Sequence, residues 1–302
     1  MRHDHGFDQA EGLRRLLLRP SLRVITVLGA HQGLGATSVV VNLAAAMARE
    51  GKQVLVLDEN LAHDNVANAL ALKPRFDLLN AVRDHKPLRE IMLHTATGVH
   101  VLPVARAMQV LPGLGAAERA RLLESLTAAS CGMDVVLVDA TADGHSVCAS
   151  LSGDEPLLLV LNATADSITE SYALLKQLAV RNGRQAFDIV VNKARNETEA
   201  RIVFDNMAQV AQRHLQVQLK YLGNIPLDEN FGHAARMRIP LLEIFPDSLA
   251  SCALIGLACK LLQPAAKEDG SNSLNQLLQR LLQQRLGMSK QKSGQSAVQL
   301  AR

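Results

Sequence analysis

The segment from Arg23 to Asn60 constrains the fold more than any other part of the chain. It reads RVITVLGAHQGLGATSVVVNLAAAMAREGKQVLVLDEN, with a β-branched strand at Val24–Leu28, a glycine-containing turn and a helix that begins near Thr37. A second strand, Gln53–Leu57, follows and ends on Asp58. A strand that turns directly into a helix presents backbone N–H groups and a helix N-terminus together, which suits the binding of phosphate. The segment therefore predicts the phosphate-binding loop of an α/β nucleotide-binding domain.

The loop lacks the cation that such loops normally carry. The pattern G-x-x-x-x-G-K-[ST] is occupied here by AHQGLGAT, residues 30–37, so that Ala36 stands in the place of the lysine. Losing one partner of a desolvated charge pair costs on the order of 2–5 kcal/mol. That cost corresponds to a roughly thirtyfold to several-thousandfold loss of affinity. The sequence therefore predicts an impaired ATP site.

Apolar runs alternate with helical patterns along the chain. This order predicts an α/β fold with a doubly wound, mostly parallel sheet and helices on both faces. The expected strands are Val24–Leu28, Val54–Leu57, Val99–Pro103, Val135–Val138, Leu157–Leu161, Ile189–Asn192 and Leu219–Ile225. The expected helices include Ser38–Glu50, Ala116–Ala129, Ser167–Arg181 and Glu197–Leu215. Because only 3% of the 302 residues are aromatic, we expect an aliphatic core.

Composition changes divide the chain into three parts. Residues 1–20 predict an N-terminal helix that ends at Pro20, and residues 21–263 the α/β domain. Residues 264–302 begin with the polar linker PAAKEDGSN and continue as an amphipathic helix and a basic tail. The four cysteines show no metal-binding spacing, which favours a reduced, cytoplasmic protein. Cys252 and Cys259 stand among apolar residues on one helix face, so we expect them to pack in the core.

Two of these segments carry a family resemblance. The run from Arg23 to Leu72, with VLDENLAHDNVANAL after the second strand, resembles the MinD/ParA class of P-loop ATPases. Within that class, DQAEGLRRLL at Asp8–Leu17 is similar to the N-terminal motif of the flagellar-number regulators of the FlhG/FleN type. The resemblance covers roughly residues 8–262. It implies a MinD-like P-loop NTPase fold and a site for ATP and Mg²⁺, which the altered loop would weaken.

The resemblance also implies roles for particular residues. The nucleotide-binding positions match Gly33, Gly35, Ala36, Thr37, Ser38, Asn65, Asp139, Asn192, Pro226 and Asp228. Thr37 and Asp139 match the Mg²⁺-linked positions. Asn192 matches the adenine-side asparagine, and the segment Gly223–Pro240 matches the loop that closes over the base.

Two further positions depart from the family pattern. The catalytic D-x-D is represented by Asp58 and Asn60, and the amide of Asn60 cannot accept a proton from an attacking water. The family's other loop lysine, which crosses a dimer interface to the partner's phosphates, matches His31. Together with Ala36, these changes predict that ATP hydrolysis is not efficient. Weak nucleotide binding and a purely structural role for the surviving loop residues both stay open.

The N-terminal motif implies a partner. In the flagellar subfamily this segment activates the GTPase of FlhF, an SRP-type protein, and the residues that match it are Asp8, Gln9, Ala10, Leu13 and Arg14. Gln9 matches the glutamine that approaches the partner's nucleotide, where an orienting amide beside an attacking water is chemically reasonable. The alternative is a helix that docks on its own domain. Other flagellar basal-body or regulatory proteins are further partners implied by the resemblance.

Leucines recur on one helical face of Leu274–Leu286. MinD-type proteins often end in an amphipathic helix that contacts membranes. The polar face here is mostly glutamine, with little of the Lys/Arg clustering that anionic lipid favours. The segment is therefore consistent with reversible membrane contact, with docking on its own domain and with homodimerisation. We expect a cytoplasmic protein that becomes peripheral at the inner membrane or cell pole if this helix binds lipid.

Three functions fit these observations to different degrees. The first is a regulator of flagellar number or placement that acts by protein contacts and stimulates FlhF, as a pseudo-ATPase. The second is a slow ATPase switch that dimerises on ATP. The third is a chromosome or plasmid partitioning protein, against which the net charge of only +3 argues, because nonspecific DNA binding needs a basic surface. No specific nucleic-acid partner is therefore expected.

Overall fold

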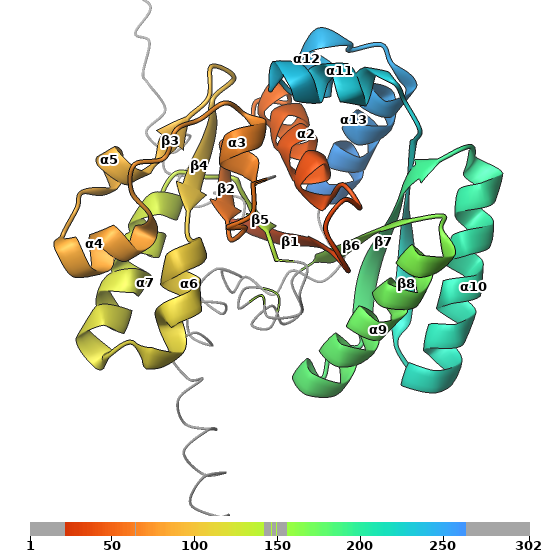
Figure 1. Cartoon of the computed structure of the whole chain (residues 1–302), viewed down its shortest axis with the longest axis horizontal. Coiled ribbons are helices and arrows are strands. Elements are labelled where there is room, and N and C mark those ends of the chain that lie inside the picture. Colours follow the sequence, from red (N-terminus) through yellow and green to blue (C-terminus); the bar gives the residue numbers. More distant parts are fainter. Residues whose placement is uncertain (1–21, 64, 142–145, 147–148, 150–155, 264–302) are drawn as a thin grey trace, which may run out of the picture.

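The computed structural model describes residues 22–63, 65–141, 146, 149 and 156–263 (Figure 1). The predicted N-terminal activator helix, with its five partner-activating positions, lies outside these residues. The same holds for the linker, the amphipathic helix Leu274–Leu286 and the basic tail. The described part contains the whole predicted α/β domain except for its first residue and short internal stretches.

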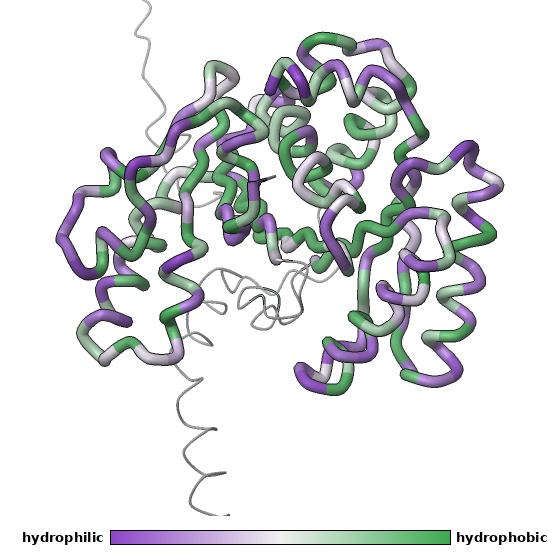
Figure 2. The backbone as a smooth tube through the Cα atoms, in the orientation of Figure 1, coloured by the Kyte–Doolittle hydropathy of each residue, from purple (hydrophilic) through white to green (hydrophobic). Residues whose placement is uncertain are grey.

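An eight-stranded sheet forms the centre of the molecule, in the order β3-β4-β2-β5-β1-β6-β7-β8. Only the β3–β4 pair is antiparallel, and the other pairs are parallel. The strands are β1 Arg23–Gly29, β2 Val54–Asp58, β3 Leu93–His94, β4 Val99–Pro103, β5 Val135–Asp139, β6 Leu157–Asn162, β7 Ala186–Ala194 and β8 Gln218–Pro226. Figure 2 shows hydrophobic residues along the central strands and hydrophilic ones on the outer helices. This distribution is expected of a sheet covered on both faces.

Helices pack on both faces of the sheet. One face carries α2 Ala36–Arg49, α3 Val66–Ala69, α11 Asn230–Met237, α12 Leu241–Ile244 and α13 Leu249–Leu262. The other carries α4 Leu78–Asp84, α5 Leu88–Ile91, α6 Ala105–Val110, the 3₁₀ turn η1 Leu111–Gly113, α7 Ala116–Ser130, α9 Ala165–Asn182 and α10 Glu197–Leu215. Each face has its own aliphatic core. The doubly wound architecture predicted from the alternation of strands and helices is therefore confirmed.

The seven predicted strands and four predicted helices are present, with boundaries that differ by a few residues. The sequence analysis missed β3, which has two residues and pairs antiparallel at the sheet edge, too short for a periodic signal. The expectation that Cys252 and Cys259 pack in the core is wrong, since both side chains are exposed on α13. The buried face of this helix is formed by neighbouring residues such as Leu254 and Leu257.

Side-chain alternation decides which residues at the strand ends face α2. In β2, Val54 and Val56 point into the core on the α2 face, so the next residue of the same parity is Asp58. In β5 the same alternation selects Asp139, and the parallel register places it opposite Asp58. Successive strand residues point to opposite faces, which directs Glu59 away from α2. The two aspartates therefore meet on the face where α2 begins.

Asp77 is a buried carboxylate that connects two helices on the face of the sheet opposite α2. It caps α4 by accepting a hydrogen bond from the N–H of Leu79 at 2.9 Å, and it also accepts from the N–H groups of Arg106 and Ala107 at 3.2 Å each. Burial raises the pKa of Asp77 above 3.8, and these hydrogen bonds oppose the rise. One side chain thus joins the first turn of α4 to α6, which lies next to the cavity described below.

We expect Asp77→Asn to lower the free energy of unfolding by about 1–3 kcal/mol, because an amide cannot accept all of these hydrogen bonds. Since the pKa of Asp77 is raised in the folded state, the folded chain binds its proton more readily than the unfolded chain. The stability that Asp77 contributes is therefore complete below about pH 3.8 and decreases as pH rises through the folded pKa. Urea unfolding should show a larger wild-type advantage at pH 4 than at pH 7. A constant or growing difference would contradict this account.

Candidate functional site

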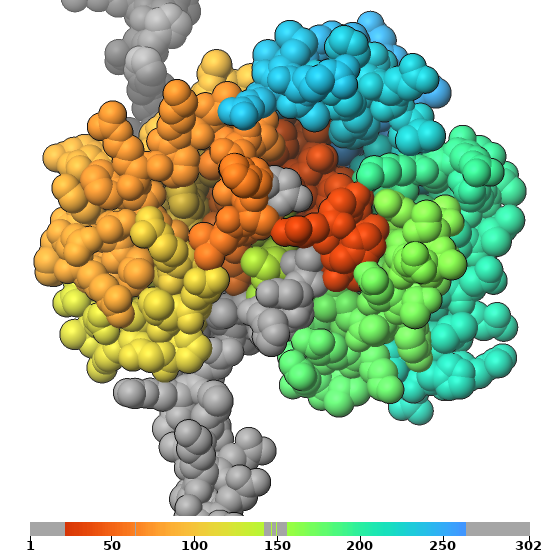
Figure 3. All heavy atoms as spheres, in the orientation of Figure 1, coloured from red at the N-terminus to blue at the C-terminus, as the bar shows by residue number. Residues whose placement is uncertain are grey.

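A cavity of about 780 Å³ opens at the carboxyl ends of the central strands. Its wall comes from the β1–α2 loop, the segments after β2 and β5, the start of α6, the end of β7 and the segment from β8 into α11. Strand β1 pairs with β5 on one side and with β6 on the other, and open α/β sheets bind ligands in the crevice at such a point. In Figure 3 the red residues of the loop and of α2 lie at the centre of this face.

The β1–α2 loop has the open form of a phosphate-binding loop. Gly33 and Gly35 adopt left-handed backbone with φ of 86° and 92°. Gly35 is the N-cap of α2, and no side chain caps the helix, so its first N–H groups remain available for an anion. A Cβ built at Gly35 would lie 2.4 Å from the Nδ2 of Asn192, so a side chain there would force Asn192 to move. The backbone of the loop therefore fits a phosphate group.

Two contacts from β7 hold this loop. The Nδ2 of Asn192 donates to the carbonyl oxygen of Leu34 at 2.8 Å, and the Nζ of Lys193 donates to that of Gly33 at 2.9 Å. Leu34 is itself buried, with 1% of its surface exposed. Side chains at the end of β7 thus hold the loop against the sheet, and the loop has no lysine of its own.

The first turn of α2 brings a hydroxyl to the paired aspartates. The Oγ1 of Thr37 donates to the Oδ2 of Asp139 at 2.9 Å, and Asp139 is the register partner of Asp58. Hydroxyl and carboxylate oxygens are the ligands that Mg²⁺ prefers. These residues fit a phosphate-bound Mg²⁺, which Thr37 and Asp139 would hold here. The metal would neutralise phosphate charge there.

Asp58 is buried behind the cavity wall. Its carboxylate accepts hydrogen bonds from the N–H groups of Asn60 and Ala67 at 3.2 Å each. Burial raises its pKa from 3.8 to about 6, against the lowering effect of those bonds. It lines a separate small cavity of about 120 Å³ together with Asn65, whose side chain caps α3 by accepting from the N–H of Asn68. Three of the predicted site residues in the described ranges, Asp58, Asn65 and Asp139, therefore do not line the large cavity.

Asn60 does line the large cavity, but its side chain is hydrogen-bonded to the neighbouring backbone. Its Oδ1 accepts a hydrogen bond from the N–H of Ala62 at 2.9 Å. The neighbouring residue Glu59 also lines the cavity and is 4% exposed, and the Oγ of Ser146 donates to its carboxylate at 2.6 Å. Sequence reasoning missed Glu59. It could have been found because it directly follows the aspartate at the carboxyl end of a buried strand.

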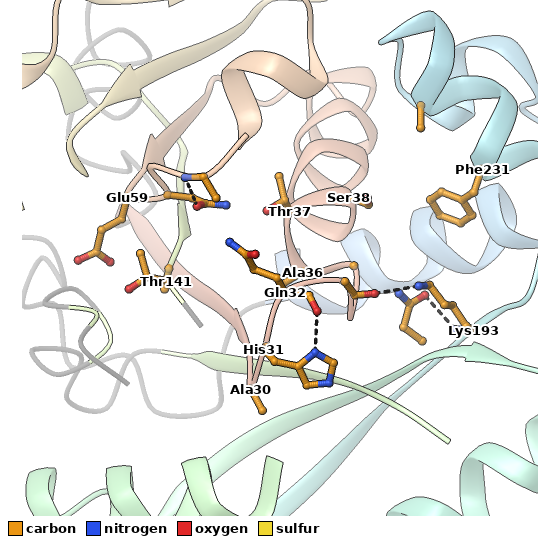
Figure 4. Close-up of a pocket in the computed structure, with 18 of the residues that line it drawn as sticks. Ala30, His31, Gln32, Ala36, Thr37, Ser38, Glu59, Thr141, Lys193 and Phe231 are labelled. Atoms are coloured by element: carbon orange, nitrogen blue, oxygen red, sulfur yellow. Dashed lines mark hydrogen bonds between the residues drawn. The ribbon is translucent and has the colours of Figure 1, made fainter. Parts of the chain in front are cut away.

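His31 is held by its own chain. Its Nδ1 lies 2.6 Å from the carbonyl oxygen of Gln32 (Figure 4). Its Nε2 lies 3.4 Å from the Oε2 of Glu170 on α9. The contact with Glu170 joins the loop to a helix on the opposite face of the sheet from α2. His31 therefore lines the cavity while its Nε2 is directed towards α9. The sequence holds no local signal for the pairing, since α9 carries two acids, Asp166 and Glu170, and nothing in the sequence distinguishes them.

The far wall of the cavity combines apolar and polar residues. Asn192, Pro226 and Asp228 all line it, as their predicted roles require, together with Leu227 and Phe231. The Oδ1 of Asp228 accepts from the N–H of Asn230 at 2.9 Å, at the start of α11. The predicted positions Gly33, Gly35, Ala36, Thr37 and Ser38 also line the cavity. An aromatic ring and an amide on one wall, opposite Thr37, are suited to a nucleoside.

Lys193 is the second residue that sequence reasoning missed. Among the described residues that line the cavity, it is the one lysine or arginine. A signal existed, because Lys193 directly follows Asn192 at the carboxyl end of a buried strand, where parallel sheets bind their ligands.

Among the helices of the described ranges, none has the length and apolar character needed to cross a membrane.

Comparisons with known proteins agree with this geometry. Residues 25–241 match the model of the CobQ/CobB/MinD/ParA nucleotide binding domain. The chain is 35% identical to the antiactivator FleN of Pseudomonas aeruginosa, over 79% of this chain and 86% of that protein. It is 24% identical to the flagellum site-determining protein YlxH of Helicobacter pylori, over 86% and 90%. The MinD cell division protein of Aquifex aeolicus superposes with a TM-score of 0.60 at 20% identity, over 81% and 98% of the two chains.

Gly35→Ala tests whether the loop depends on its close approach to β7. Gly51→Ala is a matched control, because Gly51 also has positive φ (76°) but a Cβ there meets nothing within 4 Å. We expect the control to cost about 1–2 kcal/mol of unfolding free energy, from backbone strain alone. Gly35→Ala should cost at least about 1 kcal/mol more, because Asn192 must give up its bond to Leu34. Equal losses in urea denaturation would show that the contact does not constrain the loop.

Proposed function

Because the chain belongs to the CobQ/CobB/MinD/ParA nucleotide-binding family, we propose that it regulates the number or placement of flagella through protein contacts. In this proposal its ATP site is impaired and does not support efficient hydrolysis. The similarity to an antiactivator FleN and to a flagellum site-determining protein supports the flagellar role, since both cover more than three quarters of this chain.

The loop itself carries the proposal of an impaired ATP site. Ala36 lines the cavity where the motif places its lysine, so nothing from the loop neutralises the β- and γ-phosphates. His31, at the position of the family's cross-dimer lysine, is paired with Glu170 of its own chain. Charge clamps supply most of the catalysis in phosphoryl transfer. A loop without either lysine is therefore expected to bind ATP weakly and to hydrolyse it slowly.

The partner we propose is an FlhF-type SRP GTPase. The segment from Asp8 to Leu17 resembles the activating motif of flagellar-number regulators, with Gln9 at the position of the glutamine that approaches the partner's nucleotide. This mode of action needs no ATP turnover by the chain itself, which agrees with the altered loop. Other flagellar components, and reversible membrane contact through Leu274–Leu286 at the inner membrane or cell pole, belong to the same proposal.

A slow ATPase switch that dimerises on ATP is the alternative. The retained contact between Thr37 and Asp139 favours it, because this pair can still take Mg²⁺ beside the helix N-terminus. ATP turnover by the wild-type chain that disappears in Asp58→Ala would support this second function over the first.

We expect Ala36→Lys to tighten the binding of Mg-ATP by at least about thirtyfold, since it returns one charge partner worth about 2 kcal/mol to the phosphates. Isothermal titration calorimetry of both proteins measures the change. Ala128→Lys is the control, because it adds the same charge to an exposed position of α7, outside the cavity. If the wild type already bound Mg-ATP as tightly as Ala36→Lys, the ATP site would not be impaired.

The partner proposal predicts that the full-length chain raises GTP turnover by an FlhF-type GTPase and that Gln9→Ala abolishes the effect. The amide of Gln9 would orient the attacking water, so its loss should act on turnover rather than on association. Phosphate release under saturating GTP measures the rate, and Gln218→Ala, an exposed glutamine on β8, is the control. Stimulation that survives in Gln9→Ala would contradict this role of the segment.

A further inference from the structure

We propose that Lys193 is the cation that holds a nucleotide in this cavity and that the site therefore selects nucleoside monophosphates and diphosphates over triphosphates. This inference rests on the nucleotide site of the proposed function and adds a ligand class to it. It does not depend on the flagellar partner.

A strained backbone aims Lys193 at the loop. The register between β7 and β8 pairs Asn192 with Ile225 and Ala194 with Pro226, so that Lys193 is an extra, unpaired residue in the strand. Its φ is 56°, in the left-handed region that a lysine seldom adopts. Bulges of this kind turn a side chain to a new direction. Here the result is an ammonium group 2.9 Å from the carbonyl oxygen of Gly33, at the edge of the cavity.

Local strain of this kind persists where the surrounding structure enforces it, and it is commonly found at ligand sites. The bulge is enforced from both sides, because Asn192 is bound to Leu34 and the buried Ala194 returns the strand to the core. Lys193 remains exposed and has a flexible four-carbon stem. Its ammonium can therefore turn from Gly33 to an anion bound in the loop with little rearrangement.

The ends of the cavity differ in charge. The motif places the terminal phosphates beside Ala36 and Thr37. Thr37 is hydrogen-bonded to the carboxylate of Asp139, and Glu59 lines the cavity wall. Lys193 and Phe231 lie on the opposite side of the loop from Glu59 and Thr141 (Figure 4). The cation thus stands at the nucleoside end, where Asp228 also lines the wall and accepts hydrogen bonds from the N–H groups of Asn230 and Ala250. The end that would receive a γ-phosphate has Glu59 and Asp139 and no loop lysine.

This distribution of charge leads to selection by phosphate number. A phosphate close to the nucleoside meets Lys193, whereas each added phosphate extends towards the carboxylates. Carboxylates close to a binding site repel the phosphates of a ligand, because both are negatively charged. A Mg²⁺ ion beside Thr37 and Asp139 would offset part of the repulsion. The preference for short phosphate chains should therefore be larger when Mg²⁺ is chelated than when it is in excess.

The test is calorimetric titration of the full-length protein with adenosine, AMP, ADP and ATP, in EDTA and in excess Mg²⁺. The variants are Lys193→Met and Lys193→Arg, with Lys176→Met as a control at an exposed position of α9. Thermal unfolding of each variant verifies that the fold is intact. In EDTA we expect wild-type protein to bind ADP at least about tenfold more tightly than ATP.

Lys193→Met should weaken AMP and ADP binding at least about tenfold, the effect of one hydrogen bond to a charged group. Adenosine, which has no phosphate, should be unaffected, and Lys193→Arg should keep most of the affinity. If Lys193→Met bound AMP and ADP as tightly as the wild type, the proposal would be wrong. ATP binding as tight as ADP binding in EDTA would also overturn it.

The absence of any nucleotide binding by the wild type would overturn the inference as well. That result would leave the proposed regulation intact, because the stimulation of an FlhF-type GTPase is assigned to the N-terminal segment and needs no nucleotide in this cavity. Conversely, selective ADP binding together with no GTPase stimulation would support Lys193 and refute the partner. The two proposals therefore fail independently.

Discussion

The contact between the β1–α2 loop and the end of β7 is the constraint on which the rest of the site depends. A phosphate-binding loop is a run of backbone with left-handed glycines and unpaired N–H groups, and it needs partners to stay open. In this chain Asn192 and Lys193 bind the carbonyl oxygens of Leu34 and Gly33, and Gly35 is small enough to allow the approach. Because these partners lie on the sheet, the loop keeps its shape although position 36 is an alanine.

The same contact explains why the shape of the site and its charge can change separately. The shape is fixed by backbone and by the core, since Leu34 is buried and α2 packs along its length. The positive charge of such a loop comes from side chains that project into solvent or towards the ligand. An alanine in place of a lysine at position 36 removes this charge without removing packing. Nothing in the described core needs a lysine at this position. The fold can therefore persist while the affinity for a triphosphate declines.

Much of the fold was predictable, because buried parallel strands such as β5 and β6 are continuous apolar runs between turn residues. The predicted loop glycines were recognisable from a spacing that few other structures require. Alternation could also have placed Asp58 and Asp139 on one face. The pairing of His31 with Glu170 and the contact of Lys193 with Gly33 could not be predicted, because both depend on how segments more than 130 residues apart in sequence meet in space. The short strand β3 and the exposed cysteines of α13 show the same limit on a smaller scale.

The retained motif residues and the lost ones do not carry equal weight as indications of activity. Gly35, Asp58 and Asp139 each have a structural partner, namely the amide of Asn192, the N–H groups of Asn60 and Ala67, and the hydroxyl of Thr37. The fold alone would therefore favour keeping them, whether or not ATP is hydrolysed. A lysine at position 36 would serve only a phosphate. The alanine at this position is thus the more specific indication, and it supports the proposal that the site does not hydrolyse ATP efficiently.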